Sequence, residues 1–268
     1  MKPGEKKESA FAKERSQTRN GHEETTFFGY QEVPAGEKLR LVRHHFNTVA
    51  GRYDLMNSVL SFGLHHLWKR TAVRMLGLSA GEWVIDVCGG TGDLSFLAAK
   101  AVGPRGRVVL YDINRPMMEA GRPKAIGSLL AERILWVQGD AEEISFDDGI
   151  FDAAMVGFGI RNLTHMEKGF KEMYRLLKPG GRLMCLEFSR PTAPWFRFLY
   201  DLYSFTLMPL AGMIVVGSRR AYTYLPESIR MFPSPERLAS MLEERGLSQV
   251  TYRKLTNGIA VIHLGVKR

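Results

Sequence analysis

A short apolar run at residues 83–88 leads directly into the glycine-rich segment Gly89-Gly90-Thr91-Gly92. This pattern is typical of a buried strand that turns sharply into a helix, because glycine has no Cβ and lets the backbone approach a ligand closely. Four more short apolar runs follow, at residues 107–111, 134–137, 151–158 and 182–188, and helical patterns alternate with them. Buried strands alternating with helices form a parallel sheet that is covered on both faces. The sequence therefore predicts an α/β fold.

The helical patterns cover residues 95–101, 115–126 and 165–177, and the last is ended by Pro179, Gly180 and Gly181. Two further strand patterns, at residues 250–255 and 259–266, flank Asn257-Gly258, a pair that favours a tight hairpin. We therefore predict a doubly wound, mostly parallel seven-stranded sheet that ends with an antiparallel pair.

The chain of 268 residues is predicted to contain a single domain over residues 36–268. Residues 1–35 are polar and predict a disordered arm, whereas apolar residues at helical spacing over 38–78 predict a helical preface. Residues 194–217 interrupt the strand–helix order, and 202–217 contain no charged residue. Because a membrane-spanning helix needs about 20 apolar residues, we expect this insertion to be a hydrophobic lid over a substrate pocket or an interfacial segment, with plain core packing and a spanning segment as the alternatives.

Charge and cysteine content limit the partners. Lys and Arg number 37 against 28 Asp and Glu, and residues 178–268 alone hold 13 basic and six acidic residues. Such an excess favours an anionic partner such as a membrane surface, although solvated basic side chains explain it equally well. Two distant cysteines, Cys88 and Cys185, and an N-terminus without an apolar core predict a cytoplasmic protein, with peripheral membrane association as an option. No cluster of Cys and His has metal-ligand spacing, so no metal is expected.

Acidic residues end three of the predicted strands, and their positions indicate the ligand. The dinucleotide fingerprint requires a third glycine where this chain has Ser95, and Asp93 at the helix entrance would repel a pyrophosphate. The acids suit a cationic ligand without phosphate, namely S-adenosylmethionine. Asp112, 20 residues after Gly92, is placed to accept hydrogen bonds from two ribose hydroxyls. These patterns predict that the cofactor-binding residues include Asp86, Gly89, Gly90, Gly92, Asp112 and, at the adenine amino group, Asp140.

From about residue 38 to its end, the chain resembles the ubiquinone/menaquinone biosynthesis C-methyltransferase family. The most specific segments are Tyr53-Asp54-Leu55-Met56-Asn57, Phe158-Gly159-Ile160-Arg161-Asn162 and residues 222–228. The resemblance implies a Rossmann-like class I fold, S-adenosyl-L-methionine as cofactor, and methyl transfer to a ring carbon of a polyprenyl hydroquinone. It adds Thr91 and Ala141 to the cofactor contacts, and also Gly157, where the family's usual serine is missing and only a backbone contact is expected.

The resemblance also suggests catalytic residues. Arg161 follows the strand at 151–158 on the pocket side, and arginine stays protonated at neutral pH. We therefore assign it as an oxyanion partner or water-orienter, with a surface ion pair as the alternative. Tyr53 and Tyr222 are candidates for substrate hydroxyl contacts or proton relay, with packing as the alternative. His65 is a candidate base for which a helix-surface position is expected, and His263 is expected to be a core histidine.

Other functions stay open at this point. A nucleic-acid methyltransferase would usually end the fourth strand with Asn or Asp followed by Pro-Pro and an aromatic residue, whereas here the segment is Gly157-Phe158-Gly159-Ile160. A methyltransferase for another small or lipid acceptor and a scaffold protein that has kept the fold are the remaining alternatives. The type of quinone ring, the tail length, and assembly into a homo-oligomer or biosynthetic complex are not decided by the sequence.

Overall fold

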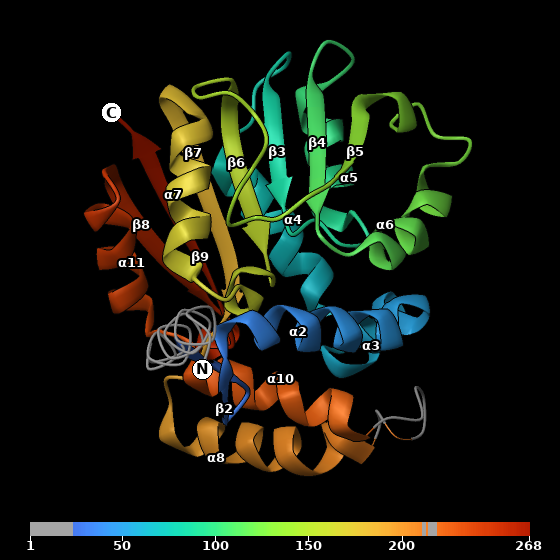
Figure 1. Cartoon of the computed structure of the whole chain (residues 1–268), viewed down its shortest axis with the longest axis vertical. Helices are drawn as coiled ribbons and strands as arrows, with labels where there is room; N and C mark the ends of the chain where they lie inside the picture. Colours follow the sequence, from blue (N-terminus) through green and yellow to red (C-terminus); the bar gives the residue numbers. More distant parts are fainter. Residues whose placement is uncertain (1–23, 211–212, 214–218) are drawn as a thin grey trace, which may run out of the picture.

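The computed structural model describes residues 24–210, 213 and 219–268. Seven strands form one sheet in the order β5-β4-β3-β6-β7-β9-β8, and β9 is antiparallel to both of its neighbours while the other pairs are parallel (Figure 1). The predicted doubly wound, mostly parallel sheet is therefore confirmed. The strand bounds are β3 Trp83–Val87, β4 Arg107–Asp112, β5 Ile134–Gln138, β6 Phe151–Gly157, β7 Leu177–Phe188, β8 Leu247–Leu255 and β9 Ala260–Lys267.

Helices cover both faces of this sheet, as parallel strands require. Buried side chains of α4 (Leu64–Leu76) and α5 (Asp93–Val102) pack on one face, and those of α7 (Met166–Leu176) and α11 (Pro235–Glu244) pack on the other. The helical pattern at 115–126 divides into α6 (Arg115–Gly121) and the 3-10 turn η2 (Arg122–Ala125), and a second such turn, η3 (Ala131–Arg133), precedes β5. The side chains of β3 and β6 are buried almost throughout because both faces are covered.

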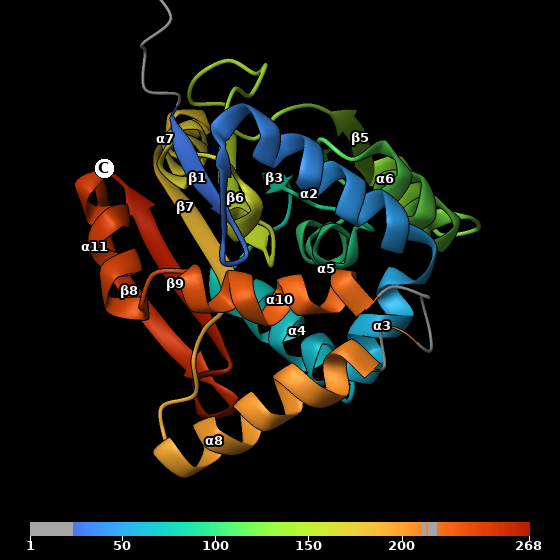
Figure 2. The ribbon, with the colours of Figure 1, turned by 60° about the horizontal axis from the view of Figure 1, so that its bottom comes forward.

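A helical cap lies across the carboxyl ends of the parallel strands (Figures 1 and 2). It contains α2 (Ala35–Val49), η1 (Ala50–Arg52), α3 (Tyr53–Leu60) and α10 (Arg219–Met231). The insertion at 194–217 adds α8 (Pro194–Leu202) and the π-helical turn η5 (Tyr203–Leu207), and its later residues lie largely outside the described part. A small core of Val49, Met56, Leu60, Met208 and Tyr222 joins the helices that precede the sheet to this insertion and to α10.

Two local predictions need correction. Residues 25–34 were expected in a disordered arm, but they form a hairpin of β1 (Thr25–Phe28) and β2 (Gln31–Pro34). Its stability comes from distant partners, since the ring of Phe28 stacks on Tyr224 at 4.2 Å. Residues 1–23 lie outside the described part. The β8–β9 connection is also longer than a two-residue turn, because Leu255 pairs with Ala260 and η6 (Thr256–Gly258) lies between them.

Within the described residues, no helix is long and apolar enough to span a membrane.

Candidate functional site

Two adjoining cavities lie between the sheet and the cap. The sheet-edge cavity is lined at the strand ends by Gly90, Asp112, Asp140, Ala141 and Gly157, and on the cap side by residues that include Arg43. Because the carboxyl ends of the parallel strands meet here, the fold brings together five of the nine predicted cofactor-binding residues. The aromatic cavity, of about 300 Å³, lies beneath the cap. Phe46, Tyr53 and Phe158 line both cavities and mark their junction.

Asp112, the last residue of β4, is the acid of the sheet-edge cavity whose two carboxylate oxygens are both held by backbone N–H groups. One carboxylate oxygen accepts the N–H of Gly90 at 2.8 Å, and the other accepts the N–H of Asn114 at 2.7 Å. Each oxygen has a further lone pair for a ligand hydroxyl. Gly90 has φ 54°, a conformation that favours glycine, and this directs its N–H at Asp112. Burial raises the pKa of Asp112 to about 6.

Ligand binding through Asp112 is expected to depend on pH. A ligand whose hydroxyls donate to Asp112 needs the carboxylate, so its affinity should be constant near pH 7 and fall up to about tenfold per pH unit below pH 6. Titration calorimetry with S-adenosylmethionine between pH 5 and 7 measures this fall. The measurement is made in an Asp86→Asn variant, because burial raises the pKa of Asp86 to about 7 and this carboxyl would titrate in the same range. In that variant, the further substitution Asp112→Asn should make the affinity independent of pH. An affinity that still falls below pH 6 would contradict this role for Asp112.

The other predicted loop residues, Asp86, Gly89, Thr91 and Gly92, do not line the sheet-edge cavity. Asp86 is buried and accepts the hydroxyl of Ser95 at 2.6 Å. Thr91 donates its hydroxyl to Asp54 of α3 at 2.7 Å. These contacts fasten the loop to α5 and to the cap, and the predicted cofactor contacts of the four residues stay a prediction.

Asp93 also differs from its predicted role of repelling phosphate. It begins α5, and each of its oxygens lies 2.7 Å from an ammonium group, one on Lys69 and the other on Lys124. These two cations compensate its charge and hold the pKa of Asp93 well below its usual range. The exclusion of phosphate ligands therefore rests on the acids of the sheet-edge cavity rather than on Asp93.

Gly157 lines the sheet-edge cavity at the end of β6. A Cβ at this position would lie 2.3 Å from Cδ1 of Leu94, which is buried. We expect Gly157→Ser to lower the free energy of unfolding by about 1 kcal/mol, the low end for overpacking, because only the tip of Leu94 must move. Denaturant unfolding of Gly157→Ser, Leu94→Ala and the double variant should be non-additive, since alanine at 94 removes the clash. Additive values would show that Leu94 does not restrict this position.

Arg161 lies in η4 (Ile160–Asn162), directly after β6, and lines the aromatic cavity. One terminal nitrogen, Nη1, donates to Glu187 at 2.7 Å and to the carbonyl of Phe158 at 2.6 Å, and Nε donates to Ser228 at 3.3 Å. Its side chain and that of Glu187 are only 7% and 1% exposed, so the alternative of a surface ion pair is wrong. The other terminal nitrogen, Nη2, makes no hydrogen bond to any described residue. Its two N–H groups are therefore available to a ligand in the cavity.

Tyr53 and Tyr222 both line the aromatic cavity. Tyr53 begins α3 and lies at the junction of the two cavities, whereas Tyr222 lies on α10 and packs with the cap core. Burial raises the pKa of Tyr222 well above its usual range, so its hydroxyl keeps its proton. The structure thus brings Arg161, Tyr53 and Tyr222, which are far apart in sequence, onto one cavity wall.

His65 differs from the sequence expectation because it is buried rather than at the helix surface. Ser61 donates its hydroxyl to the carbonyl of Asn57 at 2.6 Å, so Nδ1 of His65, 2.7 Å away, must donate to Ser61. This leaves Nε2 unprotonated, and it has no partner among the described residues. Burial lowers the pKa of His65 to about 4, so the aromatic cavity meets a neutral ring. His263 is a buried core histidine, as predicted, with Nε2 2.9 Å from the carbonyl of Pro235.

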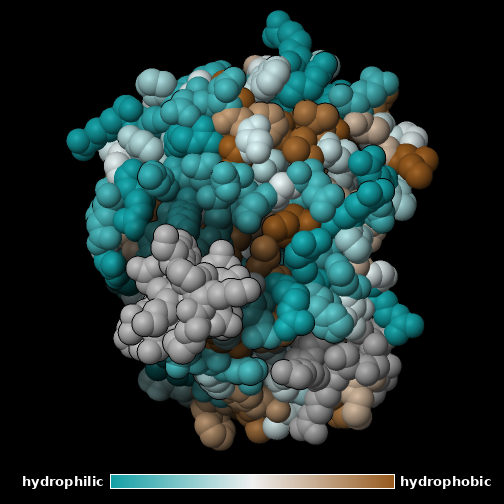
Figure 3. Space-filling view, viewed as in Figure 1, coloured by the Kyte–Doolittle hydropathy of each residue, from teal (hydrophilic) through white to brown (hydrophobic). Residues whose placement is uncertain are grey.

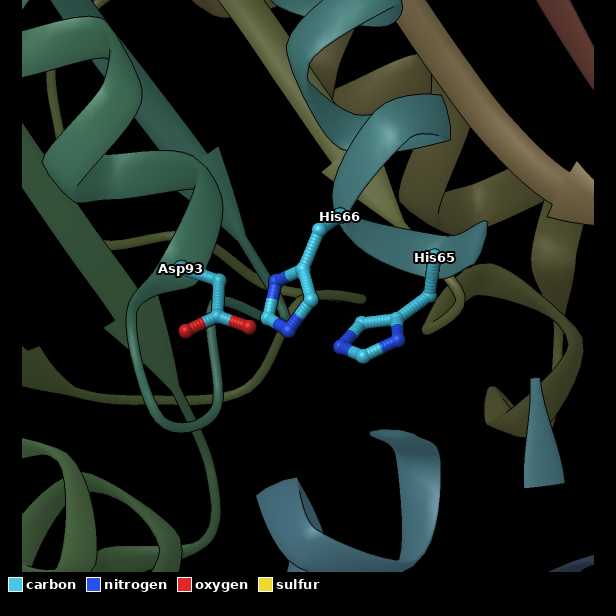
Figure 4. A group of neighbouring side chains, drawn as sticks. All are labelled: His65, His66 and Asp93. Carbon is cyan, nitrogen blue, oxygen red and sulfur yellow. The ribbon is translucent and has the colours of Figure 1, made fainter. Parts of the chain in front are cut away.

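His65, His66 and Asp93 lie side by side, with ligand atoms within 4.8 Å of one another (Figure 4). A divalent cation at this cluster would meet the ammonium groups of Lys69 and Lys124, which already occupy both oxygens of Asp93. We therefore assign no metal to this cluster.

Several residues of the site were not assigned from sequence. Glu187 holds Arg161, and Tyr224 donates its hydroxyl to Asn162 at 2.9 Å. His45 of α2 also lines the aromatic cavity, and burial together with the charge of Arg161 lowers its pKa to about 4. The only available signal was that Glu187 is a lone acid within an apolar strand pattern, since buried acids are usually paired.

Comparisons with known proteins show what this chain is similar to. The model of the ubiE/COQ5 methyltransferase family matches residues 34–267. The ubiquinone/menaquinone biosynthesis C-methyltransferase of Pseudomonas putida is 48% identical over 91% of this chain and 96% of its own length. The enzyme of the same name from Pseudomonas fluorescens is 47% identical over the same shares.

Among solved structures, a SAM-dependent methyltransferase from Thermotoga maritima covers 85% of this chain and 100% of its own, with a TM-score of 0.59 and 19% identity. At that identity the likeness shows the fold alone. The family model and the curated relatives cover nearly the whole chain, and they confirm the resemblance found in the sequence. This chain belongs to the ubiE/COQ5 methyltransferase family.

Proposed function

We propose that this enzyme transfers the methyl group of S-adenosylmethionine to a ring carbon of a polyprenyl hydroquinone in respiratory quinone biosynthesis. The observation that carries the proposal is the junction of the two cavities, where an acid-lined cavity meets an apolar one at Tyr53, Phe46 and Phe158. The curated relatives are named for this pathway, and the ring type is left open by their names.

The sheet-edge cavity fits the cofactor. Among the described residues, its wall holds three carboxylates, Asp112, Asp140 and Glu142, against the single cation of Arg43, which suits a ligand with positive charge. We assign the ribose hydroxyls to Asp112 and the adenine to Asp140 and Ala141, with backbone contacts at Gly90 and Gly157. When bound, the cofactor supplies an electrophilic methyl group on a sulfonium. The protein orients this group by fixing the nucleoside at the strand ends.

Arg161 is assigned to the acceptor. A ring carbon becomes a much better nucleophile when the neighbouring hydroxyl gives its proton to water, and a buried guanidinium favours the resulting phenolate oxygen. The new carbon–methyl bond would form as the sulfur–methyl bond breaks, a neutral thioether would leave, and the ring carbon would then release its hydrogen to solvent as a proton. The two free N–H groups on Nη2 suit that oxygen, while Glu187 and the carbonyl of Phe158 hold the other nitrogen in place. We assign Tyr53 and Tyr222 to substrate hydroxyl contacts or to proton relay. Holding the carbon in line with the methyl group lowers the barrier by up to about 7–11 kcal/mol.

The prenyl tail should be part of what the enzyme recognises. The aromatic cavity is lined by apolar side chains of the insertion, including Phe196, Leu199 and Met208. Removing the tail from the hydroquinone is therefore expected to lower kcat/KM by about tenfold or more, since even two buried CH₂ groups contribute about 1.6 kcal/mol. Steady-state assays with matched tailed and tailless substrates measure this ratio. An unchanged kcat/KM would mean that residues 194–217 do not bind the tail.

The basic excess of residues 178–268 favours association with an anionic membrane surface, where such a substrate resides. We assign the enzyme to the cytoplasmic side of that surface. Association with a second copy or with other biosynthetic enzymes is compatible with this arrangement.

The function is tested by mass spectrometry of quinones from cells that lack the protein. We expect a quinone precursor lighter by one methyl group to accumulate, and an active-site variant of Arg161 should fail to reverse this. An unaltered quinone pool, with a different methylated lipid missing, would assign the enzyme to another acceptor.

A further inference from the structure

The insertion exposes a stripe of large apolar side chains on one side of the molecule. Trp195, Phe198, Leu202 and Phe205 are 67%, 69%, 54% and 40% exposed. Their spacing of three or four residues places them on one face of the continuous helical segment formed by α8 and η5. Hydrophobic side chains also gather along the bottom of the space-filling view, where α8 lies in Figure 1 (Figure 3). An apolar stripe of this size on a water-soluble surface indicates an interaction site.

This stripe continues to the mouth of the aromatic cavity. Leu199 of α8 and Phe62 of the α3–α4 turn both line the cavity, yet they are 50% and 80% exposed. The turn at Phe62 is joined to the helical turn that follows Leu199: the ring of Phe62 is 6.0 Å from that of Tyr203, and the hydroxyl of Tyr203 donates to the carbonyl of Leu60 at 2.9 Å. A chain leaving the cavity between Phe62 and Leu199 would therefore emerge on the apolar stripe.

The charges beside the stripe favour an anionic surface. Arg197 is exposed within α8. Its Nε donates to the carbonyl of Pro191 at 3.0 Å, and its charge is not paired with an acid of any described residue. The one acid of α8, Asp201, is paired with Arg230. A helix with Trp, Phe and Leu on one side and an uncompensated arginine beside them is typical of segments that lie in the headgroup region of a bilayer.

We propose that the face formed by Trp195, Phe198, Leu202 and Phe205 docks on an anionic lipid bilayer, and that the substrate tail enters the aromatic cavity between Phe62 and Leu199. The second part rests on the proposed function, because it presupposes a prenylated substrate. The first part stands on exposure and charge alone.

The test compares two double variants of the full-length protein. Phe198→Glu/Leu202→Glu places two charges on the docking face, and neither residue lines a cavity. The control, Ile126→Glu/Leu129→Glu, makes the same charge change at two residues that are 81% and 80% exposed between η2 and η3. Co-sedimentation with phosphatidylglycerol–phosphatidylcholine vesicles should show binding weakened by more than about tenfold for the first variant and by less than about twofold for the control, because burying carboxylates in lipid is costly.

Activity assays separate this proposal from the proposed function. With a long-tailed quinol in vesicles, the docking-face variant should raise KM by more than about tenfold, whereas kcat/KM for a soluble short-tailed quinol should stay within about twofold of wild type, since neither substituted residue meets the substrate. Equal vesicle binding by both variants would overturn the docking face. The docking face would also be overturned if the wild-type protein did not bind vesicles but formed a dimer, and the first variant were monomeric. A wild-type protein that binds vesicles and methylates neither quinol would instead overturn the function.

Discussion

Loss of the Arg161 guanidinium is expected to lower kcat by about 100- to 1000-fold, the effect of removing one donor from a developing oxyanion. The variant that tests this is Arg161→Met combined with Glu187→Gln. The second substitution is needed because Glu187 is 1% exposed, and an unpaired buried carboxylate would destabilise the protein by itself. Affinity for S-adenosylmethionine should change little, since Arg161 does not line the sheet-edge cavity.

Arg161→Lys is the matched control for charge. It keeps the cation but loses the planar fork that contacts Glu187 and Phe158 and that we assign to the substrate, so we expect only partial recovery of kcat. Steady-state kinetics and calorimetry on the same preparations measure the two effects separately. An equal loss of cofactor affinity in the Met/Gln variant would reassign Arg161 to a structural role.

Asp112→Asn is expected to weaken S-adenosylmethionine binding by about 100-fold. The carboxylate is assigned to two ribose hydroxyls, and losing the charge-assisted part of each bond costs about 1.5 kcal/mol per bond. In the wild-type protein the N–H groups of Gly90 and Asn114 donate to the two oxygens of Asp112. An asparagine would place its own NH₂ group against one of these two donors. Asp147→Asn is the control, because Asp147 is an exposed loop acid outside both cavities. Similar affinities for the two variants, measured by calorimetry near pH 7, would remove Asp112 from the cofactor site.

The centre of the sheet was predictable because β3, β4 and β6 are buried on both faces, so each appears in the sequence as a short apolar run. The β1–β2 hairpin was not, since its segment is polar and its contacts lie far along the chain: Phe28 stacks on Tyr224, and the N–H of Tyr30 donates to Glu227 at 3.3 Å. No local pattern records such partners. The helices α10 and α11 were not predicted either, although α11 has a local signal: Pro235 begins it and the hydroxyl of Ser234 accepts the N–H of Arg237.

The site was predictable at the strand ends, where the fold alone decides position, as for Asp112 and Asp140. Sequence does not show whether an acid faces a cavity or is already paired. Asp86 and Asp93 appear equivalent to Asp112 in the motif, yet one bonds to Ser95 and the other to two lysines. The partner of Arg161 was likewise hidden, because Glu187 belongs to a different strand.

In the proposed reaction, the sheet-edge cavity and the aromatic cavity meet so that a sulfonium methyl reaches a hydroquinone ring. The most direct test incubates the purified protein with S-adenosylmethionine carrying a deuterated methyl group and a polyprenyl hydroquinone, and locates the label by mass spectrometry and NMR. We expect an intact deuterated methyl group on a ring carbon. A label on a hydroxyl oxygen, or no transfer by a protein that binds both molecules, would contradict it.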